Sequence, residues 1–378
     1  MAKRSKSTKK IGIPLTVVIL LAALVFGAVV GVLISPAREQ IVTLLKQNGQ
    51  SGTGGEQNNT ATSEKGQSVL GGSASFRLPV ELDEASVMEA HFIDVGQGDC
   101  ILLRFNDGVD MIIDAGSGTA RNPATVTTEM LAYLDSIQLD KLDYMIATHP
   151  HSDHMNMLDD VLKAYEVDHI YYNGWATDEK PTTAYFGDFL EAVDAETGAE
   201  IVQFDADGDV YEIEGEGYTV TIYAPGYARF EDTNYMSPMI VVEYGGRRML
   251  LTGDAEEEVE LWWMETMGGT SYDIDILKVG HHGSQKGTSD AFLEFIDPEY
   301  CVIMVGEENG TYKHPDYLTM NDLFNAGVVT YRTNRHGNIV LFLDGKGEFG
   351  FAVEQEVPVD NNKDGINDRM IVTEKAAA

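Results

Sequence analysis

The stretch "MIATHPHSDHMNML", residues 145–158, places three histidines and an aspartate within six positions directly after an apolar run. Two histidines separated by one residue on a loop, His149 and His151, can direct their imidazoles at one metal ion, and Asp153 with His154 can face a second ion beside it. Two ions held about 3.5 to 4 Å apart can generate a hydroxide and stabilise both the attacking and the leaving oxygen of a displacement reaction. The alternative is a polar surface loop, and further ligands elsewhere in the chain decide between the two.

Two later motifs supply such ligands. In "LLTGDAEEE" Asp254 follows an apolar run, and in "KVGHHGS" His281 and His282 follow another. A carboxylate at the end of one strand can bridge two cations, and a histidine at the end of a second strand can complete their coordination. Each motif alone is a weak signal. Three of them in this order, each after a predicted strand, indicate a metal centre.

Short apolar strands alternate with helical segments through the region 86–355, which we predict to be one catalytic domain. Strands mixed with interspersed helices favour two sheets with helices outside, an α+β fold with four αββα layers. At 378 residues and 43% hydrophobic content, the chain can bury one large core beside its appendages. The predicted strands include 86–95, 100–105, 110–116, 217–225, 239–246 and 247–254, and the predicted helices include 125–137 and 255–267.

The N-terminus combines a basic segment, 1–10, with an uncharged apolar run from Ile11 to Ile34. At about 1.5 Å per residue, a helix of that length spans the roughly 30 Å core of a bilayer. The sequence therefore predicts a transmembrane signal anchor at 11–34. A cleaved signal peptide is the alternative, although its apolar region usually has about 7 to 15 residues. The positive-inside rule then leaves 1–10 in the cytoplasm and predicts a single-pass protein of the cell membrane with an extracytoplasmic catalytic domain.

Two polar segments flank the predicted domain. Residues 35–85, rich in Gly, Ser, Thr, Asn and Gln, predict a flexible extracytoplasmic linker. The acidic tail, 356–378, matches the opening of a calcium loop, although Ile371 stands where the loop needs a bidentate acid. A merely polar tail is the alternative. The candidate calcium ligands are Asp360, Asn362, Asp364 and Asp368.

The charge balance is strongly acidic, with 61 Asp and Glu against 26 Lys and Arg and a formal net charge of −35. This excludes a protein that coats nucleic acid, because nonspecific affinity for a polyanion comes from lysine and arginine. A polyanionic substrate would have to be held by bound metal and a local basic patch. The two cysteines, Cys100 and Cys301, each open an apolar run and are predicted to be buried strand thiols rather than a disulfide.

Residues 90–345, roughly two-thirds of the chain, resemble the metallo-β-lactamase fold, and more closely the extracytoplasmic metallo-hydrolase domain of the ComEC/Rec2 competence proteins. Seven stretches follow that family's order: "HFIDVGQGDCILL", "MIIDAGSG", "THPHSDH", "NYMSPMIVVEYGGRRMLLTGDAE", "LKVGHHGS", "NGTYKHP" and "YRTNRHGNI".

The resemblance implies a ligand set for two divalent ions, zinc or manganese, although iron also suits such ligands. His149 and His151 would bind the first metal, and Asp254 would lie between the two ions. The second metal would be bound by Asp153, His154 and His281. Asp114 would orient these ligands through hydrogen bonds from behind, and Asp94, Gln97 and Asp99 would shape the rim of the site or only its turns.

The sequence departs from the family pattern at three places. Asn156 and Met157 stand where the family usually has glycines, so the helix after the metal loop is expected to approach differently. The histidine expected before the G-D motif is missing, since His169 comes too soon; Asn234 or Ser237 occupies that neighbourhood, and the first metal site is expected to be weaker. The loop "HHGSQKGTS" carries about one extra residue.

The remaining polar residues divide between substrate and structure. His314 in "YKHP" is predicted to face the substrate, and His336 in "TNRHG" to be a solvated loop histidine. Ser284 and His282 are candidates to hold a phosphate or to protonate a leaving group. His282 is alternatively a structural neighbour.

The resemblance implies a membrane-anchored extracytoplasmic metal-dependent hydrolase in which a metal-bound hydroxide attacks phosphorus. Asp153, Asp254 and His282 are the candidate catalytic residues. A nucleic-acid phosphodiester is the favoured substrate, because the competence branch resembles a nuclease. The alternatives are a phosphoesterase acting on envelope or small-molecule substrates, such as phosphorylcholine on teichoic acid, and an inactive metal-binding module tethered to the envelope.

Overall fold

The computed structural model describes residues 67–70, 74–77, 82–118, 122–174, 181–226, 232–306 and 313–355. The predicted membrane anchor, basic tail and calcium-loop residues Asp360, Asn362, Asp364 and Asp368 lie outside these ranges. Within the ranges, no helix has the length and apolar character needed to cross a bilayer.

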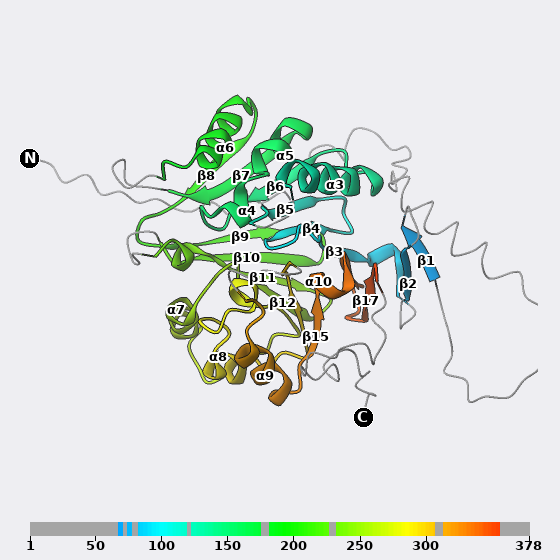
Figure 1. Ribbon diagram of the computed structural model, residues 1–378. Coiled ribbons are helices and arrows are strands. Elements are labelled where there is room, and N and C mark those ends of the chain that lie inside the picture. Colours follow the sequence, from blue (N-terminus) through cyan, green and yellow to red (C-terminus); the bar gives the residue numbers. More distant parts are fainter. Residues whose placement is uncertain are drawn as a thin grey trace, which may run out of the picture.

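The first sheet has eight strands in the order β17-β16-β3-β4-β5-β6-β7-β8 (Figure 1). Neighbours from β17 to β5 pair antiparallel, and neighbours from β5 to β8 pair parallel. The strands are β3 Met88–Phe92, β4 Cys100–Arg104, β5 Asp110–Ala115, β6 Leu142–Ile146, β7 Val167–Asn173, β8 Glu200–Phe204, β16 Ile339–Leu343 and β17 Phe349–Val353.

The second sheet has seven strands in the order β15-β14-β13-β12-β11-β10-β9. Neighbours from β9 to β12 pair antiparallel, and neighbours from β12 to β15 pair parallel. The strands are β9 Asp209–Glu214, β10 Tyr218–Ala224, β11 Met239–Tyr244, β12 Arg247–Leu251, β13 Ile276–Lys278, β14 Tyr300–Ile303 and β15 Val329–Arg332.

Helices cover the outer face of each sheet (Figure 1), so the domain has four layers. One outer core joins α3, α5 and α6 to the first sheet, and another joins α7, α8 and α9 to the second. The helices are α3 Pro123–Ser136, α4 Ser152–Met155, α5 Leu158–Ala164, α6 Ala184–Ala195, α7 Glu257–Met267, α8 Asp290–Ile296, α9 Tyr317–Asn325 and α10 Thr333–His336, with 3-10 turns η1 Glu84–Ser86, η2 Thr233–Met236 and η3 Gly280–Gly283.

Side chains alternate between the two faces along each strand, so one strand contributes residues to two separate cores. In β4, Ile101 and Leu103 belong to the core between the sheets, whereas Leu102 belongs to the core under the helices. Successive strand residues point to opposite faces, so a strand covered on both faces is apolar at every position, as in "CILL". The predicted two-sheet αββα arrangement is confirmed.

The loops at one edge of the two sheets carry the predicted metal ligands. Parallel strands place their carboxyl ends at the same edge, which brings the segments after β5 and β6 together in one sheet and those after β12 and β13 together in the other. The domain therefore joins sequence motifs more than a hundred residues apart at this edge.

Two predictions outside the core have different outcomes. The segment 35–85, predicted to be a flexible linker, contains two antiparallel strands, β1 Gln67–Leu70 and β2 Ala74–Arg77, with β2 beside β17. Backbone pairing does not require apolar periodicity, so the composition of the segment gave no signal for these strands, and the flexible linker stays a prediction. Cys100 and Cys301 are both buried free thiols, as predicted.

Candidate metal centre

The loop after β6 brings the first two histidines together. His149 Nε2 lies 3.1 Å from His151 Nδ1. His149 is buried, and His151 is partly exposed in extended backbone just before α4 begins. Together with Asp254, whose Oδ2 lies 3.8 Å from His149 Nε2, these residues form what we call the first group. Their donor atoms lie within 4.8 Å of one another.

The second group consists of Asp153 and His154 on α4, Asp254 after β12 and His282 in η3, with donor atoms again within 4.8 Å of one another. His154 Nε2 lies 3.0 Å from Asp254 Oδ1 and 3.3 Å from His282 Nε2. His282 Nε2 lies 3.4 Å from both Asp153 Oδ2 and Asp254 Oδ1. One oxygen of Asp254 therefore faces each group.

Asp254 is fixed in place by its surroundings. It is 1% exposed, and its backbone N–H donates to Ser237 Oγ at 3.1 Å. Gly253 before it has a φ of 51°, and a Cβ there would press against Ser237 and Thr148. A left-handed backbone in so tight a space requires glycine, which explains the G-D pair.

The structure places His281 and His282 differently from the predicted ligand set. The residue that joins Asp153, His154 and Asp254 is His282, whereas His281 turns toward Glu256 Oε1, 2.9 Å from its Nδ1. Both histidines have positive φ, 45° and 53°, and this turn directs their adjacent side chains to different places. His281 keeps its Nε2 3.5 Å from Asp254 Oδ2, beside the first group.

Hydrogen bonds from behind orient the second group. Asp114 accepts from the backbone N–H of Thr148 through Oδ1, and its Oδ2 lies 2.7 Å from His154 Nδ1. His282 Nδ1 donates to the carbonyl of Met304 at 2.8 Å. These contacts fix which ring nitrogen of each histidine faces the centre, and Asp114 has the place that the resemblance implies.

The arrangement fits a divalent cation in the second group. Because Met304 O can only accept, a neutral His282 presents the lone pair of Nε2, and His154 does the same while Nδ1 donates to Asp114. Two such nitrogens and two carboxylates converge on one point, with Asp254 Oδ1 3.0 Å from His154 Nε2 and 3.4 Å from His282 Nε2. Four electron-pair donors at such distances require protons or a metal ion between them.

In the metal-free chain protons take that place. Although burial opposes its charge, the carboxylates of Asp254, Asp153 and Asp99 raise the pKa of His282 to about 9. Burial likewise opposes ionisation of Asp254, yet His154 and His282 hold its pKa well below its usual range. A metal ion bound there would replace these protons.

The first group lacks the third histidine of the wider fold. Ser237 occupies that neighbourhood, with Oγ 3.2 Å from His149 Nδ1, and Asn234 donates its amide to Glu256 at 3.2 Å. Thr233 Oγ1 lies 2.6 Å from His151 Nε2. His169 lies on β7, 3.4 Å from Glu200 and stacked on Tyr144, and it is in neither group.

The loops beneath α4 interlock through backbone contacts. Asp99 N donates to Asp153 O, and Gly116 N donates to Asp99 O. A Cβ on Gly116 would collide with the backbone of Asp153 and His154, which the absence of a side chain avoids. Asn156 stands where the family usually has a glycine. Its side chain accepts from Ser117 N and donates to Ser117 O, so this difference from the family pattern adds two hydrogen bonds that hold the loops together. Met157 separates α4 from α5.

Other predicted residues have mixed positions. Asp94 Oδ1 accepts from Gly96 N, a turn role. Ser284 is buried and its Oγ accepts from Lys286 N. The ring of His314 lies 5.4 Å from that of His281, at the edge of the centre. The prediction of a solvated His336 is wrong: it is 2% exposed, with Nδ1 bonded to the backbone of Arg332, and burial lowers its pKa to about 4.

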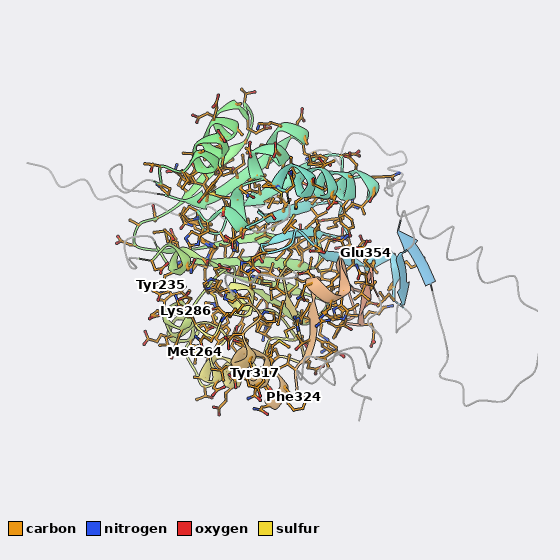
Figure 2. All side chains as sticks on the ribbon, viewed as in Figure 1. Tyr235, Met264, Lys286, Tyr317, Phe324 and Glu354 are labelled. Carbon is orange, nitrogen blue, oxygen red and sulfur yellow. The ribbon has the colours of Figure 1, made fainter. Side chains whose placement is uncertain are left out.

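Some contacts around the centre were not predicted from the sequence. Asp99 was expected at the rim but is buried, 2.5 Å from the ammonium of Lys278. Glu256 accepts from His281, Asn234 and Lys286. Lys286 and Tyr235, labelled in Figure 2, both contact Glu256, which is itself buried. The sequence did carry a signal for a buried Lys278, because this lysine lies within the apolar strand "DILKVG".

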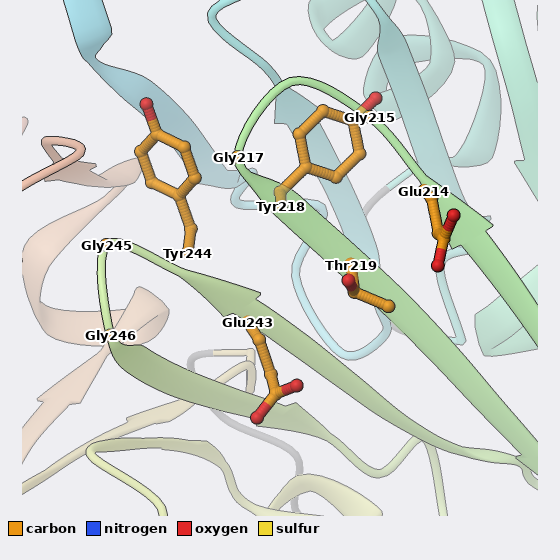
Figure 3. A pocket seen from close by; sticks show the side chains of 9 residues that line it. All are labelled: Glu214, Gly215, Gly217, Tyr218, Thr219, Glu243, Tyr244, Gly245 and Gly246. Carbon is orange, nitrogen blue, oxygen red and sulfur yellow. The ribbon is translucent and has the colours of Figure 1, made fainter. Parts of the chain in front are cut away.

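A hollow of about 490 Å³ elsewhere on the molecule has no part in this centre (Figure 3). Two glycine turns, between β9 and β10 and between β11 and β12, line it together with Tyr218 and Tyr244. It lies at the ends of β11 and β12 opposite to Ser237 and Asp254, and none of the predicted site residues lines it.

A mixed two-sheet domain with histidine and aspartate clusters at the strand ends is the arrangement of the metallo-β-lactamase class, whose members are generally metal-dependent hydrolases. The chain belongs to the Metallo-beta-lactamase superfamily, whose model matches residues 93–307, more than half of its length.

Relatives agree with the resemblance to competence proteins. The chain is 28% identical over 264 residues to ComE operon protein 3 of Bacillus subtilis (strain 168), covering 66% of this chain and 32% of that protein. It is 30% identical over 233 residues to Recombination protein 2 of Haemophilus influenzae (strain ATCC 51907 / DSM 11121 / KW20 / Rd), covering 61% and 26%. It is 26% identical over 280 residues to Competence protein ComA of Neisseria gonorrhoeae, covering 74% and 35%. The chain thus spans between about a quarter and about a third of these relatives' length.

Proposed function

We propose that this protein is a metal-dependent phosphodiesterase that cleaves nucleic acid. The observation that carries the proposal is Asp254, a buried carboxylate with one oxygen toward each of two ligand groups. A shared carboxylate is suited to holding two divalent ions, zinc or manganese, side by side. The names of the relatives, which refer to competence and recombination, support nucleic acid as the substrate class.

Bound ions would activate water and stabilise charge on the phosphoryl oxygens. The side chains of the protein would position the attacking water and the substrate. Asp153, partly exposed in the second group, would hold the attacking water in line. His281, 18% exposed and held by Glu256, is the imidazole open to a bound substrate, with His314 beside it. His282 is buried and would act as a ligand rather than as a proton donor.

The test is cleavage of single- and double-stranded DNA by the full chain with zinc or manganese supplied. Asp254→Ala is expected to lower the cleavage rate on the order of 1,000-fold, because both groups lose their shared ligand. Asp188→Ala, an exposed aspartate on α6, is the matched control and should leave the rate unchanged. Full metal occupancy in the unaltered chain without cleavage would remove nucleic acid from the proposal.

The second candidate substrate is a phosphoester of the envelope or a small molecule, such as phosphorylcholine on teichoic acid. The net charge of −35 favours it, since an acidic protein repels a long polyanion more than a small ester. The same variants assayed on a phosphorylcholine ester separate the two substrates. Cleavage of neither, with metal bound, would favour a metal-binding envelope module.

The membrane location is part of the proposal and rests on the sequence of residues 11–34 alone. If these residues anchor the chain with the catalytic domain outside, protease added to intact cells will digest that domain. Deletion of 1–34 should then release the protein from the membrane fraction.

A further inference from the structure

Lys278, the last residue of β13, is a lysine with no exposed surface. Its Nζ lies 2.5 Å from Asp99 Oδ2 and donates to the carbonyl of Gly253 at 3.0 Å. Lysine is almost never fully buried unless it is paired. The ion pair with Asp99 is therefore a specific feature behind the metal centre, and the proposed mechanism makes no use of it.

The pair lies against a third cluster of acidic and imidazole groups. The donor atoms of Asp99, Asp114 and His154 lie within 4.8 Å of one another, a spacing that could hold a cation. The ammonium of Lys278 already contacts Asp99 Oδ2, which lies 3.9 Å from His154 Nδ1. We infer that Lys278 is a positioning residue that serves as the resident cation of this cluster and assembles the ligand cage before any metal binds.

The contacts of the pair explain how it would assemble the cage. The backbone of Asp99 bonds to Asp153 and to Gly116, and Asp99 Oδ1 lies 3.4 Å from His282 Nδ1. On its other side Lys278 holds Gly253, the residue before Asp254. One ammonium group thus links the loop before β4 to the loop that carries the shared aspartate.

Charge explains why this cation matters most in the metal-free chain. Asp99, Asp114, Asp153 and Asp254 gather around two histidines in a poorly solvated space. Removing one partner of a buried ion pair leaves an uncompensated charge, which is strongly destabilising. Divalent ions in the two groups would supply positive charge nearby, so the loss of Lys278 should be felt less when metal is present.

The experiment measures the thermal midpoint of the full chain with a chelator and with saturating zinc or manganese. Lys278→Met is expected to lower the metal-free midpoint by about 10 °C and to regain more than half of that loss with metal. Asp99→Asn combined with Lys278→Met removes both charges and should recover most of the metal-free midpoint. Lys346→Met, an exposed lysine paired with the exposed carboxylate of Asp83, is the control and should change neither value.

Two results would overturn the inference. One is a Lys278→Met midpoint that matches the unaltered chain, and the other is an equal loss with and without metal, since Lys278 would then act through packing alone. If Lys278→Met does not fold under either condition, the double variant decides: a folded double variant supports charge compensation, and an unfolded one contradicts it. The inference rests on the metal centre of the proposed function but not on its substrate, because no readout involves cleavage.

Discussion

The two ligand groups share Asp254 but are supported very differently. In the second group His154 and His282 are buried, and each directs its outer ring nitrogen to Asp114 or to the Met304 carbonyl. In the first group, within the part of the chain that the structure describes, the outer nitrogens of His149 and His151 lie next to the hydroxyls of Thr148, Ser237 and Thr233. A carboxylate or carbonyl is a stronger acceptor than a hydroxyl and raises the basicity of the histidine it holds.

This difference explains how one site can bind two metal ions with unequal affinities. The second group has four ligands with fixed orientation, and the first has three, with a serine in the neighbourhood of the missing histidine. We therefore expect the second group to fill first and to hold its ion more tightly. The sequence had predicted a weak first site from the missing histidine alone, and the outer hydrogen bonds supply a second reason.

The largest effect is expected when each of the two adjacent histidines is replaced by alanine in a separate variant. His282→Ala should weaken binding of one metal ion on the order of 1,000-fold, about 4 kcal/mol, since the second group loses a ligand. His281→Ala should leave two ions per chain, because its Nδ1 and Nε2 face Glu256 and the rim of the first group. Metal content after desalting measures both.

His169→Ala, a histidine on β7 outside both groups, is the matched control. If His281→Ala loses an ion while His282→Ala keeps both, the placement of His282 in the second group is wrong and the resemblance gave the correct ligand.

The next effect concerns the loop that carries His282. Glu260 of α7 accepts from the backbone of Thr288 and Ser289, and burial raises the pKa of Glu260 to about 7. A carboxyl whose pKa is higher in the folded chain stabilises the fold fully below its unfolded value of 4.5, and this stabilisation is lost as the pH rises through about 7. The contribution amounts to about 3 kcal/mol.

Glu260→Gln should therefore flatten the fall in unfolding free energy between pH 5 and 8, measured by urea denaturation. It should also be less stable than the parent at pH 5, because its amide nitrogen meets backbone donors. Glu265→Gln, an exposed residue farther along the same helix, should preserve the slope of the parent. If the unfolding free energy of Glu260→Gln fell with pH as steeply as that of the parent, the carboxyl of Glu260 would not titrate between pH 5 and 8.

Much of this arrangement was predictable from the sequence. Strand periodicity predicted the two-sheet fold, and the three motifs predicted five of the residues in the two groups, since each motif directly follows a predicted strand. The choice between His281 and His282 was not predictable, because it depends on two successive left-handed residues and on the position of the Met304 carbonyl. The burial of Asp99 was missed for a similar reason, as its partner Lys278 is 179 residues away in the chain.

The smallest effect tests the outer contacts themselves. Asp114→Asn should weaken the ion of the second group about 10- to 100-fold, because an amide nitrogen would face His154 Nδ1 and the ring would lose its orientation. Thr233→Val should weaken the ion of the first group only about threefold, since the neutral hydrogen bond between its hydroxyl and His151 Nε2 contributes little. Titration calorimetry with zinc gives both affinities. Equal losses in the two variants would mean that the hydroxyls support the first group as firmly as the carboxylate supports the second, and the difference in affinity would then come from ligand number alone.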